Sequence, residues 1–152
     1  MKKWLMSILV TAIILAGCSA KEETIAFEDK QFASTLVIQK VEHNASTEEK
    51  TKMVTEEDKI EKTLTQMEGL EVEEISQDSF MKKLKSKSSY TFVFLGPDQK
   101  ESGKGKYAFT ILEDGTILFN FTKVEDPGST MISKQKQPEV LKELKNQLDV
   151  SF

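Results

Sequence analysis

The sequence has no arginine, so each of its 21 basic residues is a lysine. Arginine supplies the planar fork that reads phosphates and guanine bases, so its absence argues against a nucleic-acid partner. Acidic residues outnumber the lysines, 25 to 21, which gives a formal net charge of −4. A chain of this charge is not expected to bind anionic lipid headgroups electrostatically. We expect a mildly acidic, soluble surface.

Side chains that commonly perform catalysis are also scarce. His43 is the single histidine. As a catalytic base it would need a partner to orient it, and we expect it to be an exposed loop residue. No G-x-S-x-G nucleophile motif is present, and Gly103 and Gly105 lack the following helix of a phosphate-binding loop. The acidic residues within 68–78 match no cation-binding loop pattern. We therefore predict no enzymatic activity, no cofactor and no metal, while hydrolysis by carboxylates alone stays an open alternative.

The apolar run at the N-terminus is too short to cross a bilayer. Residues 4–16 supply about 13 positions, against the roughly 20 that a spanning helix needs. The run follows Lys2 and Lys3 and is closed by small residues, an order typical of a secretory signal peptide. An uncleaved membrane anchor is the alternative.

The residues Leu15-Ala16-Gly17-Cys18 resemble the lipobox of bacterial lipoproteins. This resemblance implies cleavage between Gly17 and Cys18 and a diacylglyceryl group on the Cys18 sulfur. It also implies a lipid-anchored protein at the extracytoplasmic face of the cell membrane, where two acyl chains hold a protein stably. Cys18 is the single cysteine, so lipidation accounts for it. Size, lipobox and lysine-only basicity together resemble the small lipoproteins of low-GC Gram-positive bacteria.

These features divide the chain into three parts. Residues 1–17 are the predicted lipoprotein signal peptide, 18–31 a lipidated tether, and 32–152 a single α+β domain. As a random coil, the polar part of the tether would reach roughly 20 Å. Ile25 and Phe27 are its apolar residues, and their docking on the domain is the alternative to a free stalk.

Hydrophobic patterning predicts an antiparallel sheet of about four strands, at 34–42, 89–95, 106–113 and 116–123. Helices are predicted at 56–68 and 138–148, packed on the sheet by apolar stripes such as Ile60, Leu64 and Met67. A short strand at 52–54 and a helical turn near 78–85 are weaker candidates. The acidic run at 71–74 is predicted to be solvated surface, and 124–136 a loop. A helix followed by a hairpin that starts at Tyr107 and turns at Asp114-Gly115 is also similar to PepSY-type modules.

Asp114-Gly115 lies between two alternating runs and predicts a tight hairpin. With a two-residue turn, the core face of the hairpin carries Leu112, Ile117, Phe119 and Phe121. The opposite face is unusually apolar, and its members are Tyr107, Phe109, Ile111 and Leu118. Two interpretations stay open, because another part of the chain can cover this face, or the face can be an exposed binding platform.

The sequence thus favours a membrane-anchored, non-enzymatic binding or modulating module of the cell envelope. The predicted partners are the membrane, through the lipid on Cys18, and an envelope protein. The alternative is a lipoprotein that carries a small ligand, such as a lipid, a peptide or a metal, in a closed pocket between sheet and helices.

Overall fold

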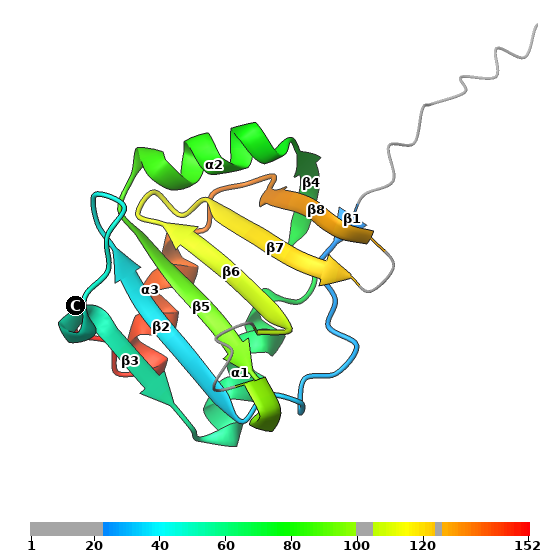
Figure 1. The fold of residues 1–152 in the computed structure, drawn as a ribbon. Helices are drawn as coiled ribbons and strands as arrows, with labels where there is room; N and C mark the ends of the chain where they lie inside the picture. Colours follow the sequence, from blue (N-terminus) through cyan, green and yellow to red (C-terminus); the bar gives the residue numbers. More distant parts are fainter. Residues whose placement is uncertain (1–22, 100–104, 124–125) are drawn as a thin grey trace, which may run out of the picture.

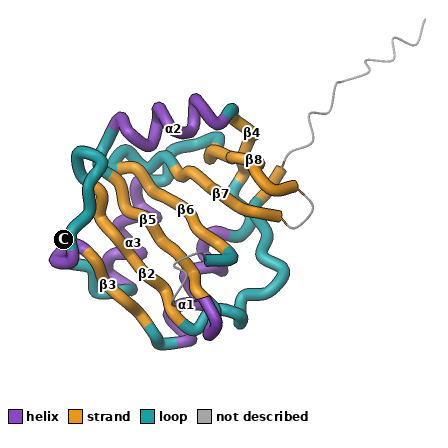
Figure 2. The backbone as a smooth tube through the Cα atoms, viewed as in Figure 1, coloured by secondary structure: helices purple, strands orange, loops and turns teal. Residues whose placement is uncertain are grey.

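The fold is an eight-stranded antiparallel sheet with α-helices on both faces (Figures 1 and 2). The computed structural model describes residues 23–99, 105–123 and 126–152. The predicted signal peptide and its cleavage site at Gly17 and Cys18 lie outside these residues. The strand order is β1-β4-β8-β7-β6-β5-β2-β3. The α+β class with an antiparallel sheet is confirmed, whereas the prediction of about four strands is wrong.

Four central strands lie where the hydrophobic patterning places them. They are β2 (Thr35–Val41), β5 (Ser89–Leu95), β6 (Tyr107–Leu112) and β7 (Ile117–Lys123). The four additional strands extend the sheet on both sides and are β1 (Glu23–Thr24), β3 (Thr51–Val54), β4 (Glu71–Ile75) and β8 (Asp126–Ser133). Two of these, β4 and β8, fall in segments that the sequence predicts as solvated surface and loop.

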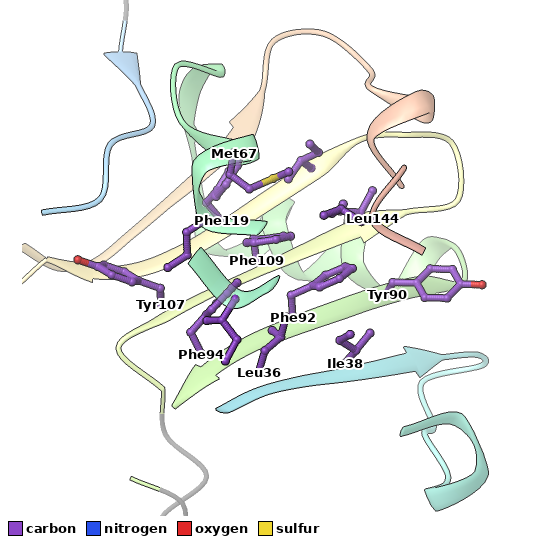
Figure 3. Packing of buried hydrophobic residues seen from close by; sticks show 14 of the residues in the cluster. Leu36, Ile38, Met67, Tyr90, Phe92, Phe94, Tyr107, Phe109, Phe119 and Leu144 are labelled. Atoms are coloured by element: carbon purple, nitrogen blue, oxygen red, sulfur yellow. The ribbon is translucent and has the colours of Figure 1, made fainter. Parts of the chain in front are cut away.

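One face of the sheet is covered by α1 (Glu57–Met67) and α3 (Pro138–Gln147). In Figure 1 both helices lie behind the strands. The predicted stripe of α1 is buried, with Leu64 and Met67 fully enclosed. Figure 3 shows Phe92, Phe109 and Phe119 gathered in the core beneath Met67 of α1 and Leu144 of α3. This layer is the main hydrophobic core.

The other face is covered over part of its width by α2 (Gln77–Ser86). The helix begins after Ser76, whose hydroxyl accepts a hydrogen bond from the Ser79 N–H at 3.2 Å, as N-cap residues do. Its Phe80 is buried against Leu112, Leu118 and Ile132 of the sheet. Among the described residues the two sides of the sheet are therefore unequal, with two α-helices on one and a single α-helix on the other.

The segment predicted as a tether is part of the folded body from Glu23 onward. Ile25 and Phe27 are only 4% and 6% exposed. The Ile25 N–H donates to the Leu70 carbonyl at 3.0 Å, and the Gly69 N–H donates to the Ile25 carbonyl at 2.8 Å. Over its described part, 23–31, the segment therefore follows the docked alternative, because apolar burial and backbone pairing hold it against β4 and the turn after α1.

The β6–β7 hairpin has a three-residue loop in place of the predicted two-residue turn. Phe109 pairs with Phe119 and Ile111 with Ile117, and the Leu112 N–H donates to the Thr116 carbonyl at 2.8 Å. Gly115 adopts a φ of 84°, the left-handed conformation of a three-residue hairpin loop with a bulge. Because the loop has one residue more than predicted, the pairing of the two strands shifts by one residue. Side chains that were predicted to share a face therefore lie on opposite faces.

Candidate binding surface

The second sheet face has a covered half and an open half. In the covered half, Leu112, Leu118 and Ile132 lie under α2 and are at most 7% exposed. The open half is the same face of β3, β2, β5 and the adjoining part of β6, and no described α-helix lies in front of it in Figure 1. The boundary follows β6, where Thr110 is buried. The open half is the candidate functional surface.

Strand register places the central side chains of this face in two rows that run across the strands. Beyond the rows, Thr35, Ser89 and Leu95 of the same face are buried, at most 4% exposed. Cross-strand partners share a face. The first row is apolar and comprises Met53, Val37, Val93 and Ala108. The second row is uncharged but can form hydrogen bonds, and it comprises Thr51, Gln39, Thr91 and Thr110. The Thr91 and Thr110 hydroxyls form a hydrogen bond at 3.1 Å.

The exposed fraction of the side chains differs along these rows. Met53 is 63% exposed and is the large hydrophobic side chain that the described part of the chain leaves most open to solvent. Val37, Gln39, Thr91 and Val93 are half-buried. Beyond Val93 the face is bounded by Gly105, where a Cβ atom would lie 2.8 Å from Val93 Cγ1.

None of the eight side chains in the two rows is charged, although 30% of the whole chain is. An antiparallel sheet with one solvated face usually alternates apolar residues inward with polar residues outward. Depletion of charge with exposure of methionine is the composition found at the centre of protein binding surfaces.

A shallow hollow of about 370 Å³ adjoins the open half. Its sheet side is formed by Gln39, Thr51 and Met53, and its outer wall by Ser46, Thr47 and Glu48 of the β2–β3 connection. The connection is held by a tight turn in which His43 and Asn44 have φ values of 52° and 62°. This volume is at the lower end of the range for small-molecule sites.

The charges at the end of β2, beside the open half, are paired with one another. Hydrogen bonds from the ammonium groups of Lys40 and Lys50 lower the pKa of the Glu42 carboxyl to about 2. The Lys40 ammonium lies 2.7 Å from a Glu42 oxygen. These groups close the end of β2, whereas the exposed Glu48 carboxylate lies in the wall of the hollow.

A second ion cluster stabilises the covered half. The Asp114 carboxylate in the hairpin loop lies 2.7 Å from the Lys87 ammonium and 2.8 Å from the Lys136 ammonium. Burial acts to raise the pKa of Asp114, but hydrogen bonds from Lys136, Lys87 and the Thr116 N–H outweigh it and hold the pKa well below its usual range. This carboxylate therefore connects the end of α2 to the hairpin and to the segment before α3.

The predicted platform is not a surface in the structure. Tyr107, Phe109 and Ile111 belong to the main core under α1 and α3, and Phe109 and Ile111 are at most 1% exposed. Leu118 lies on the opposite face, fully buried under α2. The hairpin register explains the error, since Leu118 pairs with Thr110 and not with Ile111. Leu112, predicted in the main core, lies under α2 for the same reason, and the Phe121 side chain is outside the described residues.

Sequence reasoning missed the residues of the open half. Val37 and Gln39 alternate with the buried Leu36 and Ile38 along β2, so the alternation marks them as facing away from the main core. Tertiary packing determines which part of that second face α2 covers. No local pattern in β2 or β3 reports it.

The described side chains of the open half are hydroxyl, amide and apolar groups, which can form hydrogen bonds and van der Waals contacts with an occupant. His43 is exposed on the turn. Over residues 23–99, 105–123 and 126–152, no group of three or more histidine, cysteine, aspartate or glutamate side chains is arranged to hold a metal ion. The same residues include no helix with the length and apolar character that crossing a membrane requires. Comparison of the chain with protein-family models, curated proteins and solved structures returns no match.

Proposed function

We propose that this chain is a lipid-anchored, non-enzymatic binding module on the extracytoplasmic face of the cell membrane. Its anchor is the diacylglyceryl group on Cys18, and its binding surface is the open half of the second sheet face. The observation that carries the binding role is the neutrality of that face. A chain rich in charge exposes Met53 beside Val37 and Val93 with no charged side chain between them.

The folded body supports this role more than it supports a ligand carrier. A carrier needs an enclosed pocket between sheet and helices, but there the side chains of Phe92, Phe109 and Leu144 fill the layer (Figure 3). The hollow described above opens on the surface beside Met53. A partner held against the outside of the sheet fits this arrangement.

The anchor is tested by mass spectrometry of the mature chain isolated from membranes. The expected N-terminal peptide begins at Cys18 and carries the mass of a diacylglyceryl group. A Cys18→Ser variant is expected to leave the membrane fraction. An unmodified Cys18, or a retained leader, would contradict the anchoring part of the proposal.

The binding surface is tested by placing a photo-crosslinking residue at position 53 in cells and comparing it with one at position 66, on the α1 side. We expect crosslinks to an envelope component from position 53, and we expect these crosslinks to be lost when Val37→Lys is added. Val140→Lys is the matched control, because Val140 is also a half-buried valine but lies on α3. Equal crosslinking with and without Val37→Lys would overturn the assignment of the surface.

A further inference from the structure

The open half ends at the outer edge of β3, where the sheet itself ends. β3 is the last strand on this side of the sheet, and within the described residues it pairs with β2 alone (Figure 1). Edge strands are usually protected by charged side chains, lysine above all. The lysine of β3, Lys52, is instead half-buried, and its ammonium group donates to the Asp149 carbonyl at 2.7 Å. The edge is therefore accessible to another extended chain.

The backbone groups that this edge leaves free are centred on Met53. The Thr51 N–H donates to the Glu48 carbonyl, so Thr51 does not form a hydrogen-bonded pair with its partner in β2. Because hydrogen-bonded and non-hydrogen-bonded pairs alternate along an antiparallel ladder, Met53 also directs its N–H and carbonyl away from β2. The next outward N–H, that of Thr55, donates to the Glu56 carboxylate at 3.2 Å. An added strand therefore finds its free partners in one register, with a residue opposite Met53.

This register determines where the side chains of an added strand would lie. Cross-strand partners share a face, so the residue opposite Met53 would contact a side chain that is 63% exposed. An apolar residue at that position would cover the Met53 thioether. The residue two positions along the added strand would lie opposite Thr51, beside the hollow whose outer wall includes Glu48.

Both ends of the edge are acidic. Four carboxylates flank β3, all of them exposed and, in the part of the chain that the structure describes, without an ion pair. They are Glu48 and Glu49 before β3 and Glu57 and Asp58 after it. The adjacent Lys50 and Lys59 are already paired with other carboxylates. The flanks therefore favour a basic occupant.

A second copy of this chain does not match these charges. Two β3 strands paired antiparallel about Met53 would bring Glu49 of one chain toward Glu57 of the other. The same pairing would bring Glu48 toward Asp58, so like charges would approach each other at both ends of the edge. The occupant is therefore expected to be a different chain.

We infer that the occupant of the β3 edge is an extended basic segment of a partner protein, an inference that rests on the binding role proposed above. The segment would extend the eight-stranded sheet by one strand and exchange backbone hydrogen bonds with Met53. It would carry an apolar residue opposite Met53 and a lysine or arginine two positions away, near Glu48. In such strand addition, backbone hydrogen bonds supply the affinity and alternate side chains supply the specificity.

Synthetic peptides test this inference on the full chain. The chain is labelled at its methionines with ¹⁵N in the amide and ¹³C in the methyl group, and it is purified from membranes in uncharged detergent micelles. The probe is the acetylated and amidated heptapeptide Thr-Lys-Thr-Val-Thr-Lys-Thr, whose valine would lie opposite Met53. A second peptide has glutamate in place of both lysines. A third is N-methylated at the valine, so it keeps every side chain but lacks the N–H that the Met53 carbonyl would accept.

The expected result is a saturable shift of the Met53 amide and methyl signals by the lysine peptide, with a Kd of about 1 mM or tighter. Met67, which is fully buried under α1, should not shift. The glutamate and N-methylated peptides should bind at least tenfold more weakly. Glu48→Gln should weaken the affinity for the lysine peptide at least threefold, whereas Glu139→Gln, at an exposed carboxylate in the first turn of α3, should leave it unchanged.

The inference is overturned if the lysine peptide does not shift Met53, if either comparison peptide binds equally well, or if Glu48→Gln has no effect. Crosslinking of an envelope component from position 53 in cells, together with any of these failures, would leave the binding role standing and reject the extended basic segment.

Discussion

The covered and the open halves of the second sheet face use the same strands differently. Under α2, outward-facing positions carry Leu118 and Ile132, which are as buried as core residues. Beside them, with no described α-helix above, the central outward positions of β2 and β5 carry valine, glutamine and threonine. The packing of α2 explains the apolar residues of the covered half. No described α-helix covers the open half, and solvation alone does not explain why its two rows carry no charged side chain. From this contrast we propose that packing under α2 determines the residues of the first half and binding those of the second.

The largest expected effect is the loss of a side chain from the covered half. Leu118→Ala removes a fully buried leucine between Phe80 and the sheet, and such truncations cost about 2–5 kcal/mol. We expect about 3 kcal/mol by chemical denaturation. Val93→Ala in the open half is the matched truncation, and we expect about 1 kcal/mol or less because Val93 is half-buried. Equal losses at the two sites would abolish the distinction between the halves.

An intermediate effect is expected at Asp114, whose carboxylate holds the end of α2 to the hairpin. Asp114→Asn removes the charge that Lys87 and Lys136 share, and a hydrogen bond to a charged group contributes about 1.5–3 kcal/mol. We expect a loss of about 2 kcal/mol at neutral pH, measured by thermal or chemical unfolding. Lys142→Met is a suitable control, because Lys142 is exposed and contacts Glu139 at 3.7 Å.

The pH dependence of that effect has a defined sign. The pKa of Asp114 is lower in the folded than in the unfolded chain, so its stabilisation is fully present above the unfolded pKa of about 3.9. The difference between the original chain and Asp114→Asn should therefore be constant from pH 6 to 8. It should shrink as the pH falls below about 4. A difference that grew on acidification would contradict the assigned ion pairs.

The smallest expected change in stability comes from Met53→Lys. Met53 is 63% exposed, and substitutions at such positions usually change stability by no more than about 0.5 kcal/mol. The same change places a charge within the apolar row, so binding should fall while the unfolding midpoint stays in place. An unchanged yield from a photo-crosslinking residue placed at position 37 of the Met53→Lys chain would separate the surface from function.

Local patterns predicted the elements whose residues satisfy one simple periodicity. The strand at 89–95 and the helix at 138–148 coincide with β5 and α3 within one residue. β4 was missed because Glu71, Glu73 and Glu74 make it resemble solvated surface, and its pairing with β8 and burial of Val72 compensate. β8 was missed because Pro127 and Gly128 are typical of a turn, yet Pro127 pairs with Thr122 beyond a register shift.

The candidate surface was harder to predict than the fold. An apolar second face was recognised at the hairpin, but a one-residue register error placed Phe109 and Leu118 together when they lie on opposite faces. The position of α2 decides which half of the face is open. That position depends on long-range packing of Phe80, so the sequence of β2 and β3 does not contain it.

The most direct measurement of the central claim is the rate of Met53 oxidation by hydroxyl radicals in intact envelopes and in the purified chain. If the open half is occupied in the envelope, Met53 should be oxidised several-fold more slowly there, while Met81, half-buried on α2, should react alike in both. Equal oxidation of Met53 in the two preparations would contradict the claim that this neutral face is a binding surface.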